Sequence, residues 1–331
     1  MSPDRPASRR ARCLRWLQRR KLELGVVALG ILLRLSMTWN YGYRWGYDAD
    51  SHWDVVQWIV KHGVVPYASA TIESFHPPLW YVLTAWFVNH GLTRPTAIWI
   101  SIVSGALRLG VIWAFLELFV PRSRTARLSG LALAAVTSIS IQVDGMIYPE
   151  ALNGLLAALA LLLLGLGARR PDGRRWPLAI ALGVVTGLAV LTKASGVVLV
   201  VSIASVAALE LVVVDRPWRV RLQRVLPWMG AIVIAISVCG WYSARNVREY
   251  DKPFVTSFET SQSFFVDKSN KLALLDRRTL GYLLGWDRGL YLFPFGIYAV
   301  GSHPRFFSVT VASTFVDFYD HHFEEIGRAH V

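Results

Sequence analysis

The chain has 331 residues, of which 54% are hydrophobic and only 17% are charged. This composition, with its positive mean hydropathy, excludes a single soluble domain and predicts an all-α polytopic membrane protein. The formal charge of +13 could suggest nucleic acid as a partner. Because the basic residues fall in short clusters between apolar stretches, without an aromatic-interleaved basic domain, we expect no nucleic-acid partner.

The N-terminal segment 1–21 is basic and precedes an apolar run from Leu22 to about Trp39. No small-residue cleavage site follows, and Arg34 interrupts the run, so we expect an uncleaved first span rather than a signal peptide. Further apolar stretches of roughly membrane-crossing length occur at 96–120, 127–143, 151–168, 177–192, 195–214 and 226–243. The sequence therefore predicts a basic cytoplasmic N-terminus and a seven-span membrane module over residues 22–243.

Lys and Arg are concentrated in the N-terminus and in the segments 121–127, 169–175 and 215–224. The positive-inside rule places all of these in the cytoplasm. Two crossings must then precede residue 121, so only one of the segments 77–90 and 96–120 can be a span. The first is short, holds Asn89 and begins with two prolines, and we expect it to lie on or dip into the outer face.

This topology places the acidic clusters at the extracytoplasmic ends of the spans. The large first loop, residues 40–95, contains Asp48, Asp50, His52 and His76, and a second loop ends at Glu150. Lys193 lies at the outer turn between two spans, and Arg245 and Asn246 lie just beyond the last span. Solvated loops also hold carboxylates, but charges grouped on one face of a membrane bundle form a candidate site.

Five short motifs occur in a fixed order on this side: "YDADSH" (47–52), "HPPLWY" (76–81), "YPE" (148–150), "LTKASG" (191–196) and "GWYSARNVREYDKPF" (240–254). In this order the chain resembles the membrane glycosyltransferases of the GT-C fold. It is most similar to the bacterial branch related to protein mannosyltransferases and the lipid A aminoarabinose transferase. The resemblance extends from the first span to about residue 255 and implies a seven-helix module with a catalytic first loop.

Two positions depart from the family pattern. The first loop has Asp48-Ala49-Asp50 where many relatives have adjacent Asp and Glu, which leaves open which aspartate is the primary acid. His76 occupies the place where the aminoarabinose enzymes have Lys, which leaves the contact to the leaving group open.

The expected chemistry follows from the location of the site. No pool of nucleotide-sugars is expected outside the cytoplasmic membrane, so the sugar donor must arrive on a lipid, typically a polyprenyl phosphate. The leaving phosphate needs cations or hydrogen-bond donors, whereas the acceptor hydroxyl needs a carboxylate base with a pKa near neutrality. We therefore expect sugar transfer to a glycan, lipid or protein acceptor. The alternative is a transporter or flippase, which would place polar groups near the bilayer midplane.

The two first-loop aspartates are the main catalytic candidates. Asp48 is the expected general base, and Asp50 is a second base or an acceptor ligand. The alternative is that one of them caps a helix that begins near Ser51. Asp54 is expected to be solvated or to stabilise the helix. Glu150 is either a second acidic element of the site, as the resemblance implies, or a favourable charge at a helix N-terminus.

The basic candidates are expected to contact a lipid phosphate. His52 and His76 would bind phosphate or a carboxylate, or hydrogen-bond to other site residues; their spacing matches no strong metal motif, so no metal site is assigned, although a divalent metal is possible. Lys193 would meet the phosphate, the alternative being that it only reaches the membrane surface. Arg245, together with Asn246, could clamp the phosphate.

Three further charged residues and two segments complete the expectations. Arg34 and Arg108 lie inside spans and should form internal ion pairs or carbonyl contacts, and Asp144 is a less favoured site residue. Residues 244–324 should form an extracytoplasmic loop with an interfacial part. The last residues, "EIGRAHV" (325–331), match the translation of a sequencing adapter, so we expect a C-terminally truncated chain that is inactive on its own.

Overall fold

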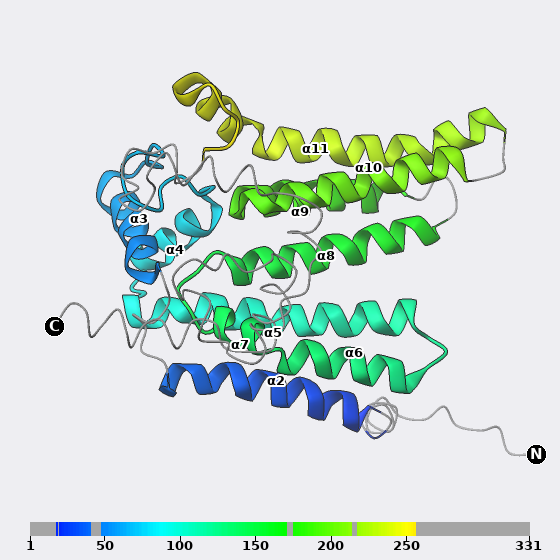
Figure 1. Ribbon diagram of the computed structural model, residues 1–331, viewed down its shortest axis with the longest axis horizontal. Helices are drawn as coiled ribbons and strands as arrows, with labels where there is room; N and C mark the ends of the chain where they lie inside the picture. Colours follow the sequence, from blue (N-terminus) through cyan, green and yellow to red (C-terminus); the bar gives the residue numbers. More distant parts are fainter. Residues whose placement is uncertain (1–17, 19, 41–47, 171–174, 214–216, 256–331) are drawn as a thin grey trace, which may run out of the picture.

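The computed structural model describes residues 18, 20–40, 48–170, 175–213 and 217–255. Within them every regular element is a helix, and most helices lie side by side as long rods (Figure 1). The helices are α2 (Lys21–Asn40), α3 (Ala49–His62), α4 (Leu79–Asn89), α5 (Arg94–Phe119), α6 (Arg124–Val136), α7 (Ser138–Asp144), α8 (Glu150–Arg169), α9 (Trp176–Thr192), the short η1 (Ala194–Gly196), α10 (Val197–Val212) and α11 (Trp218–Tyr250). Residues 1–17 and 19 of the predicted N-terminal segment 1–21, residues 256–324 of the predicted loop 244–324, and the last segment 325–331 lie outside these residues.

The described helices confirm the expected polytopic membrane class. Five helical stretches are long and apolar enough to cross a membrane, and six if the bent pair α6 and α7 is one span. The remaining predicted span, at 177–192, corresponds to α9, which has 17 residues and is about 25 Å long, somewhat less than a typical hydrocarbon core. The predicted short segment at 77–90 is α4, which has only 11 residues.

The predicted span at 127–143 is not one straight helix. It is interrupted at Thr137, where the chain is extended (φ −61°, ψ 115°), and α6 and α7 are bent by 51°. The Thr137 hydroxyl donates to the Leu133 carbonyl at 2.6 Å, so the side chain occupies an acceptor at the end of α6 where the helix stops.

The last described helix is longer than predicted at both ends. Helix α11 has 33 residues, or about 50 Å, whereas the apolar pattern predicted a span only at 226–243. Its ends carry Arg and other good helix formers that continue the helix beyond an apolar core. The part of the predicted extracytoplasmic loop from residue 244 to Tyr250 is therefore helical.

The two ends of the bundle differ in the way that the charge pattern predicted. Helices α3 and α4 gather at one end of the bundle, and the turn from α5 to α6 lies at the opposite end (Figure 1). The last turns of α8 and α10 and the first turns of α9 and α11 lie at the same end as the α5–α6 turn. The described residues of the three basic segments therefore share one end, as the even number of crossings between these segments requires.

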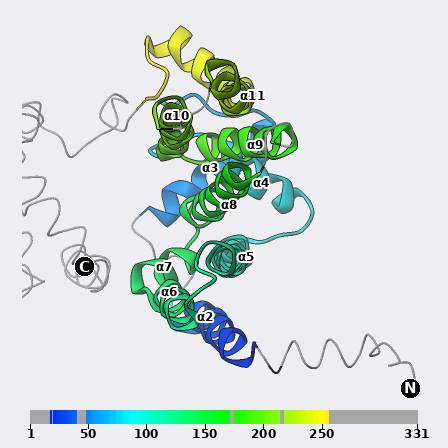
Figure 2. The ribbon, with the colours of Figure 1, turned by 90° about the vertical axis from the view of Figure 1, so that its right-hand side faces the viewer.

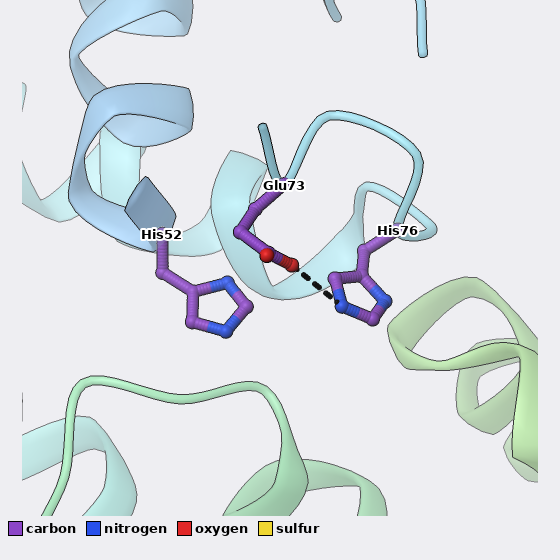
Figure 3. Close-up of side chains that lie close together, drawn as sticks. All are labelled: His52, Glu73 and His76. Carbon is purple, nitrogen blue, oxygen red and sulfur yellow. Dashed lines mark ion pairs between the residues drawn. The ribbon is translucent and has the colours of Figure 1, made fainter. Parts of the chain in front are cut away.

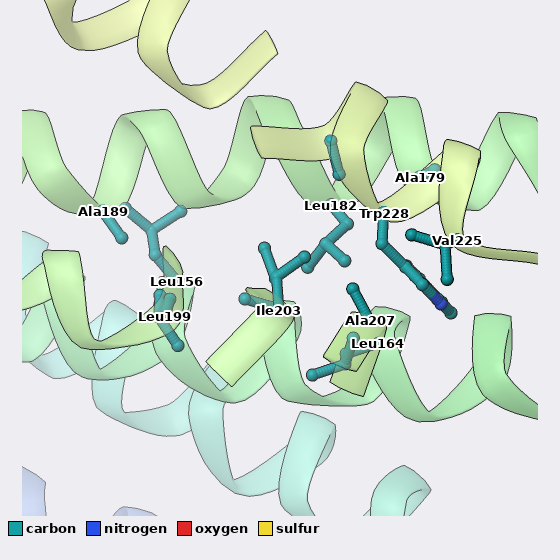
Figure 4. Packing of buried hydrophobic residues seen from close by; sticks show 12 residues of the cluster. Leu156, Leu164, Ala179, Leu182, Ala189, Leu199, Ile203, Ala207, Val225 and Trp228 are labelled. Carbon is teal, nitrogen blue, oxygen red and sulfur yellow. The ribbon is translucent and has the colours of Figure 1, made fainter. Parts of the chain in front are cut away.

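Close helix packing is built on small residues. Helices α9 and α11 are in extensive contact, because Gly183 and Gly187 leave room for the α11 backbone: an added Cβ would come within 2.5 Å of the Ala231 carbonyl oxygen and 2.8 Å of the Ala235 carbonyl oxygen. Small residues at such crossings let backbones approach closely. Leu182 and Trp228 lie in the apolar cluster that joins α8, α9, α10 and α11 (Figure 4).

A second apolar cluster supports the end that carries α3 and α4. Helix α3 buries one face, which includes Trp53 and Val56, against Trp80 of α4 and Ile147 in the segment before α8. Apolar residues three to four positions apart form such a face. This cluster fixes the first loop against the bundle and so positions the polar residues of α3.

A buried ion-pair network joins three helices. Both Arg34 of α2 and Arg108 of α5 donate to Asp144 Oδ2 of α7, at 2.6 Å and 2.7 Å, and Arg34 also donates to the carbonyls of Gly30 and Ala135. The side chains of Arg34 and Asp144 are completely buried. The predicted internal ion pairs of the two arginines are thus confirmed, and Asp144 belongs to them.

We predict that Asp144→Asn lowers the free energy of unfolding by about 3 kcal/mol, because two guanidinium groups lose their buried counter-charge. Reversible unfolding of the purified protein in mixed micelles measures this loss, with Asp54→Asn on the exposed face of α3 as the control. Equal stability of the two variants would contradict the structural role of the network.

We predict that the two ends of the bundle lie on opposite sides of the membrane, with the basic turns inside. Single cysteines replacing the exposed residues Arg122 or Arg219 should react with an impermeant maleimide only after the cells are opened. A cysteine replacing the exposed Lys61 should react in intact cells, in a background without the native cysteines. Labelling of position 122 from outside would overturn the orientation.

Candidate functional site

Six charged or titratable side chains from four parts of the chain gather at the end of the bundle that carries α3 and α4. We call them the polar cluster: Asp48, His52, Glu73, His76, Glu150 and Lys193. They come from the start of α3, the loop between α3 and α4, the start of α8 and the end of α9. Every one except Glu73 was predicted from the sequence.

Asp48 lies at the N-cap position of α3, and its side chain makes no capping hydrogen bond. Its backbone N–H donates to the Tyr148 hydroxyl at 2.8 Å, which ties the first loop to the segment before α8. Burial raises the pKa of Asp48 to about 6, and the negative charges of Glu73 and Glu150 contribute to the rise, partly offset by His76. The carboxylate therefore has the pKa of a base that works near neutrality.

The loop between α3 and α4 begins at Gly63, which ends α3 in the left-handed conformation (φ 69°) that glycine adopts without strain. Further along, His76 Nε2 and a carboxylate oxygen of Glu73 are 2.9 Å apart (Figure 3). Both side chains are largely buried. The Tyr242 hydroxyl of α11 donates to the Phe75 carbonyl at 3.0 Å. Helix α11 thus holds the loop at the residue before His76.

His52 is the most deeply buried member of the polar cluster, with 1% of its surface exposed. Its Nδ1 shares a hydrogen bond of 2.6 Å with the Tyr81 hydroxyl, and its ring lies edge-on to Tyr148 with centroids 4.6 Å apart. Burial lowers the pKa of His52 well below its ordinary value, and the positive charges of His76 and Lys193 add to this effect. His52 is therefore neutral near pH 7.

Lys193 and Glu150 form an ion pair between the end of α9 and the start of α8. Both side chains are about a quarter exposed. Lys193 binds Glu150 Oε1, whereas the other oxygen, Oε2, is buried and receives no hydrogen bond from the residues that the structure describes. The pair thus places a cation and a free acceptor side by side at the edge of the polar cluster.

The second predicted aspartate lies elsewhere. The Asp50 side chain is 70% exposed and pairs with Arg94 at the start of α5. The groups that raise the pKa of Asp48 do not include it. Of the two candidate bases, the structure therefore brings Asp48, and not Asp50, into the polar cluster. Asp54 is exposed on α3, as expected for a solvated residue.

The predicted phosphate clamp on α11 contacts the loop instead. Arg245 donates to the carbonyls of Val65 and Pro66 at 3.2 Å and 3.0 Å, and its guanidinium lies over the ring of Tyr67 at 5.4 Å from the centroid. Asn246 is fully buried and donates to the Pro253 carbonyl at 3.3 Å. In this structure both residues support backbone segments, because loop carbonyls need donors that the loop itself does not supply.

Sequence reasoning missed Glu73 and the tyrosines that contact the polar cluster. The signal for Glu73 was its position three residues before His76, in a loop with few other charges. Tyr81 and Tyr148 lie inside the quoted motifs "HPPLWY" and "YPE", but a tyrosine next to a helix end has no pattern that separates a hydrogen-bonding role from a packing role.

Comparison with known proteins identifies the family and the fold. Residues 75–242 match the family described as dolichyl-phosphate-mannose-protein mannosyltransferase, and this match includes three members of the polar cluster: His76, Glu150 and Lys193. A search of curated proteins found no significant match.

Two solved structures of Archaeoglobus fulgidus oligosaccharyltransferase are similar to the chain. The apo crystal structure aligns with a TM-score of 0.53 and 14% identity over 91% of this chain. The complex of the enzyme, AglB, with an inhibitory peptide and a dolichol-phosphate aligns with a TM-score of 0.49 and 14% identity over 90% of this chain. The chain covers about two fifths of either oligosaccharyltransferase, 40% and 39%. The first likeness shows a shared fold.

The family match spans just over half of the chain, and the helical architecture that surrounds it agrees with the GT-C fold of the apo oligosaccharyltransferase. The chain therefore belongs to the dolichyl-phosphate-mannose-protein mannosyltransferase family of membrane glycosyltransferases.

Proposed function

We propose that this protein transfers a sugar from a polyprenyl-phosphate-linked donor to an acceptor hydroxyl, at the polar cluster on the extracytoplasmic face of the cell membrane. The observation that carries the proposal is the position of Asp48: a carboxylate with a pKa of about 6 lies in one cluster with the Lys193–Glu150 pair. A base and a cation are the two groups that this reaction needs. The name of the matched family, which includes a dolichyl-phosphate sugar, supports a lipid-phosphate donor.

Asp48 would act as the general base. Its carboxylate takes the proton of the acceptor hydroxyl as the oxygen attacks the anomeric carbon. The bond from that carbon to the donor phosphate breaks, and the phosphate leaves with the electron pair. A pKa of about 6 keeps the carboxylate ionised at neutral pH and still basic enough to accept a proton.

Lys193 would neutralise the donor phosphate. The ammonium group lies at the junction of α9 and η1, and it is about a quarter exposed, so a lipid phosphate can reach it. Lys193 pairs with Glu150 in this structure. When the donor binds, its phosphate would form a second ionic contact with the same ammonium group. Glu150 Oε2, which is buried without a donor among the described residues, would then accept a hydrogen bond from the acceptor or the sugar.

In this proposal each expected segment of the chain has a separate role. The module at 22–243 forms the membrane bundle, and the first loop at 40–95 contributes the base. A transporter or flippase has no comparable support. The buried charges of the bundle, Arg34, Arg108 and Asp144, are bound to one another and to carbonyls, as a structural network requires.

We predict that Asp48→Asn lowers the rate of transfer about 100-fold or more at neutral pH, the usual scale for general-base catalysis, while the donor still binds. The wild-type rate should rise with pH up to about 6, where Asp48 loses its proton, and then stay level; an ordinary aspartate would place this rise near pH 4. The residual rate of the variant should lack the rise. The measurement is transfer from a labelled polyprenyl-phosphate sugar in proteoliposomes that contain the full-length parent of this chain, because the chain is expected to be inactive on its own.

Asp54→Asn, on the exposed face of α3, is the matched control and should keep the wild-type rate and pH profile. Near-normal turnover of correctly inserted Asp48→Asn would remove Asp48 from the mechanism.

We predict that Lys193→Ala raises the apparent KM for the lipid donor about tenfold or more, because a charge-assisted contact to the phosphate is lost. Lys193→Arg should restore most of the affinity, since it keeps the cation. Titration of the donor in the same transfer assay measures both values, with Lys61→Ala at the exposed end of α3 as control. An unchanged KM in Lys193→Ala would exclude a phosphate contact.

A further inference from the structure

Two histidines and a glutamate of the polar cluster converge on one point. His52, Glu73 and His76 each offer a nitrogen or oxygen ligand atom, and these atoms all lie within 4.8 Å of one another. In Figure 3 the Glu73 carboxylate lies above and between the two imidazole rings, which come from α3 and from the loop. The ring centroids of His52 and His76 are 5.5 Å apart.

We propose that His52, Glu73 and His76 bind a zinc ion with two imidazole nitrogens and one carboxylate oxygen. This donor set suits zinc, which accepts nitrogen and oxygen ligands in tetrahedral geometry. Mg²⁺ and Ca²⁺ prefer sets made of oxygen atoms alone. Three protein ligands leave the fourth position of a tetrahedral ion open, as in zinc sites that bind a water or a substrate.

The surroundings of His52 orient it as a ligand. Its Nδ1 is held by the Tyr81 hydroxyl at 2.6 Å, which leaves Nε2 as the metal-binding nitrogen. A hydrogen bond at the other ring nitrogen is the usual way to fix the tautomer and direction of a ligating histidine.

The position of the loop is fixed from the opposite side. Tyr242 of α11 donates to the Phe75 carbonyl, and His76 donates its backbone N–H to the Glu73 carbonyl at 3.2 Å. Ligands of a tetrahedral zinc ion lie about 3.3 Å apart. The ligand atoms here lie within 4.8 Å of one another, and His76 Nε2 is already 2.9 Å from Glu73, so the longest separation needs to shorten by at most about 1.5 Å. Rotation of the His76 ring, which is 17% exposed, and of Glu73 about their own side-chain bonds can provide this movement.

The local charge also favours a cation. The Glu73 carboxylate lies 2.9 Å from His76 Nε2, and Asp48 begins the helix that carries His52. Lys193 is the balancing charge that pairs with Glu150. If the proposed function holds, on which this step rests, the open position of a bound zinc ion would accept a phosphate oxygen of the donor or the oxygen of the acceptor hydroxyl.

The same side chains could hold the loop without a metal. In that case the Glu73–His76 ion pair and the His52–Tyr81 hydrogen bond are complete by themselves, and the site has no affinity for zinc. The two accounts differ in a measurement that does not depend on catalysis.

The experiment measures zinc bound to the purified chain in nanodiscs. The protein is stripped with a chelator, titrated with Zn²⁺, freed of unbound metal and analysed by mass spectrometry for zinc per chain. We expect one zinc ion per wild-type chain and at least a tenfold weaker affinity in Glu73→Gln and in His76→Gln. Tyr81→Phe should weaken binding by about tenfold, because it removes only the partner of a ligand.

His90→Gln is the matched control, since His90 is an exposed histidine at the end of α4 whose Nδ1 contacts the Trp86 carbonyl; it should bind zinc as the wild type does. Every variant must keep the wild-type helical circular dichroism and elute as one species. His76→Gln changes the most exposed of the ligands, so it tests the site even if Glu73→Gln does not fold. Absence of saturable zinc in the wild type, or equal zinc affinity in His76→Gln and His90→Gln, would overturn the proposal.

Zinc and transfer assays on the full-length parent of this chain separate this proposal from the proposed function. Zinc bound at the site in a full-length parent that shows no sugar transfer would contradict the function and leave the metal site intact. Transfer by a wild-type protein that binds no zinc would overturn the metal site alone.

Discussion

The contact of Asp144 with Arg34 and Arg108 is the interaction on which the rest of the described structure depends. Ionised groups are costly inside an apolar bundle, so they persist only where they are paired. This pairing holds α2, α5 and α7 together just after the bend at Thr137. The chain then continues to Tyr148, which binds the backbone of Asp48, and to Glu150. A buried charge therefore determines where the first and second loops meet.

The opposite side of the polar cluster depends on α11. The helix extends past the apolar pattern to Tyr250, and its last turns supply donors to the backbone of the first loop. The Tyr242 hydroxyl donates to the Phe75 carbonyl, and the Arg245 guanidinium donates to the carbonyls of Val65 and Pro66. Loops without regular hydrogen bonds are ordered only when another element satisfies their carbonyls. The positions of Glu73 and His76 thus follow from contacts to a helix far away in the sequence.

Most of the helices could be predicted, because long apolar stretches leave few alternatives in a membrane. The break at Thr137 could not be predicted, because the sequence has neither Pro nor Gly at this point. The break arises from one threonine side chain and from packing. For the site, the one-sided charge pattern correctly brought Asp48, His52, His76, Glu150 and Lys193 to one end of the bundle. It could not separate Asp48 from Asp50, because that depends on which face of α3 is buried. It also did not predict that Arg245 donates to the carbonyls of the first loop, because backbone carbonyls that require a donor cannot be recognised in a sequence.

We propose that the polar cluster, and no other part of the bundle, receives the lipid phosphate and its sugar. A polyprenyl-phosphate sugar with a photoreactive group on the first isoprene unit can locate the bound donor, with the crosslinked peptides identified by mass spectrometry. We predict crosslinks to the α9–α10 turn near Lys193 and to the first loop, and competition by unmodified donor. Crosslinks confined to the basic turns at 121–127 and 169–175 would contradict it.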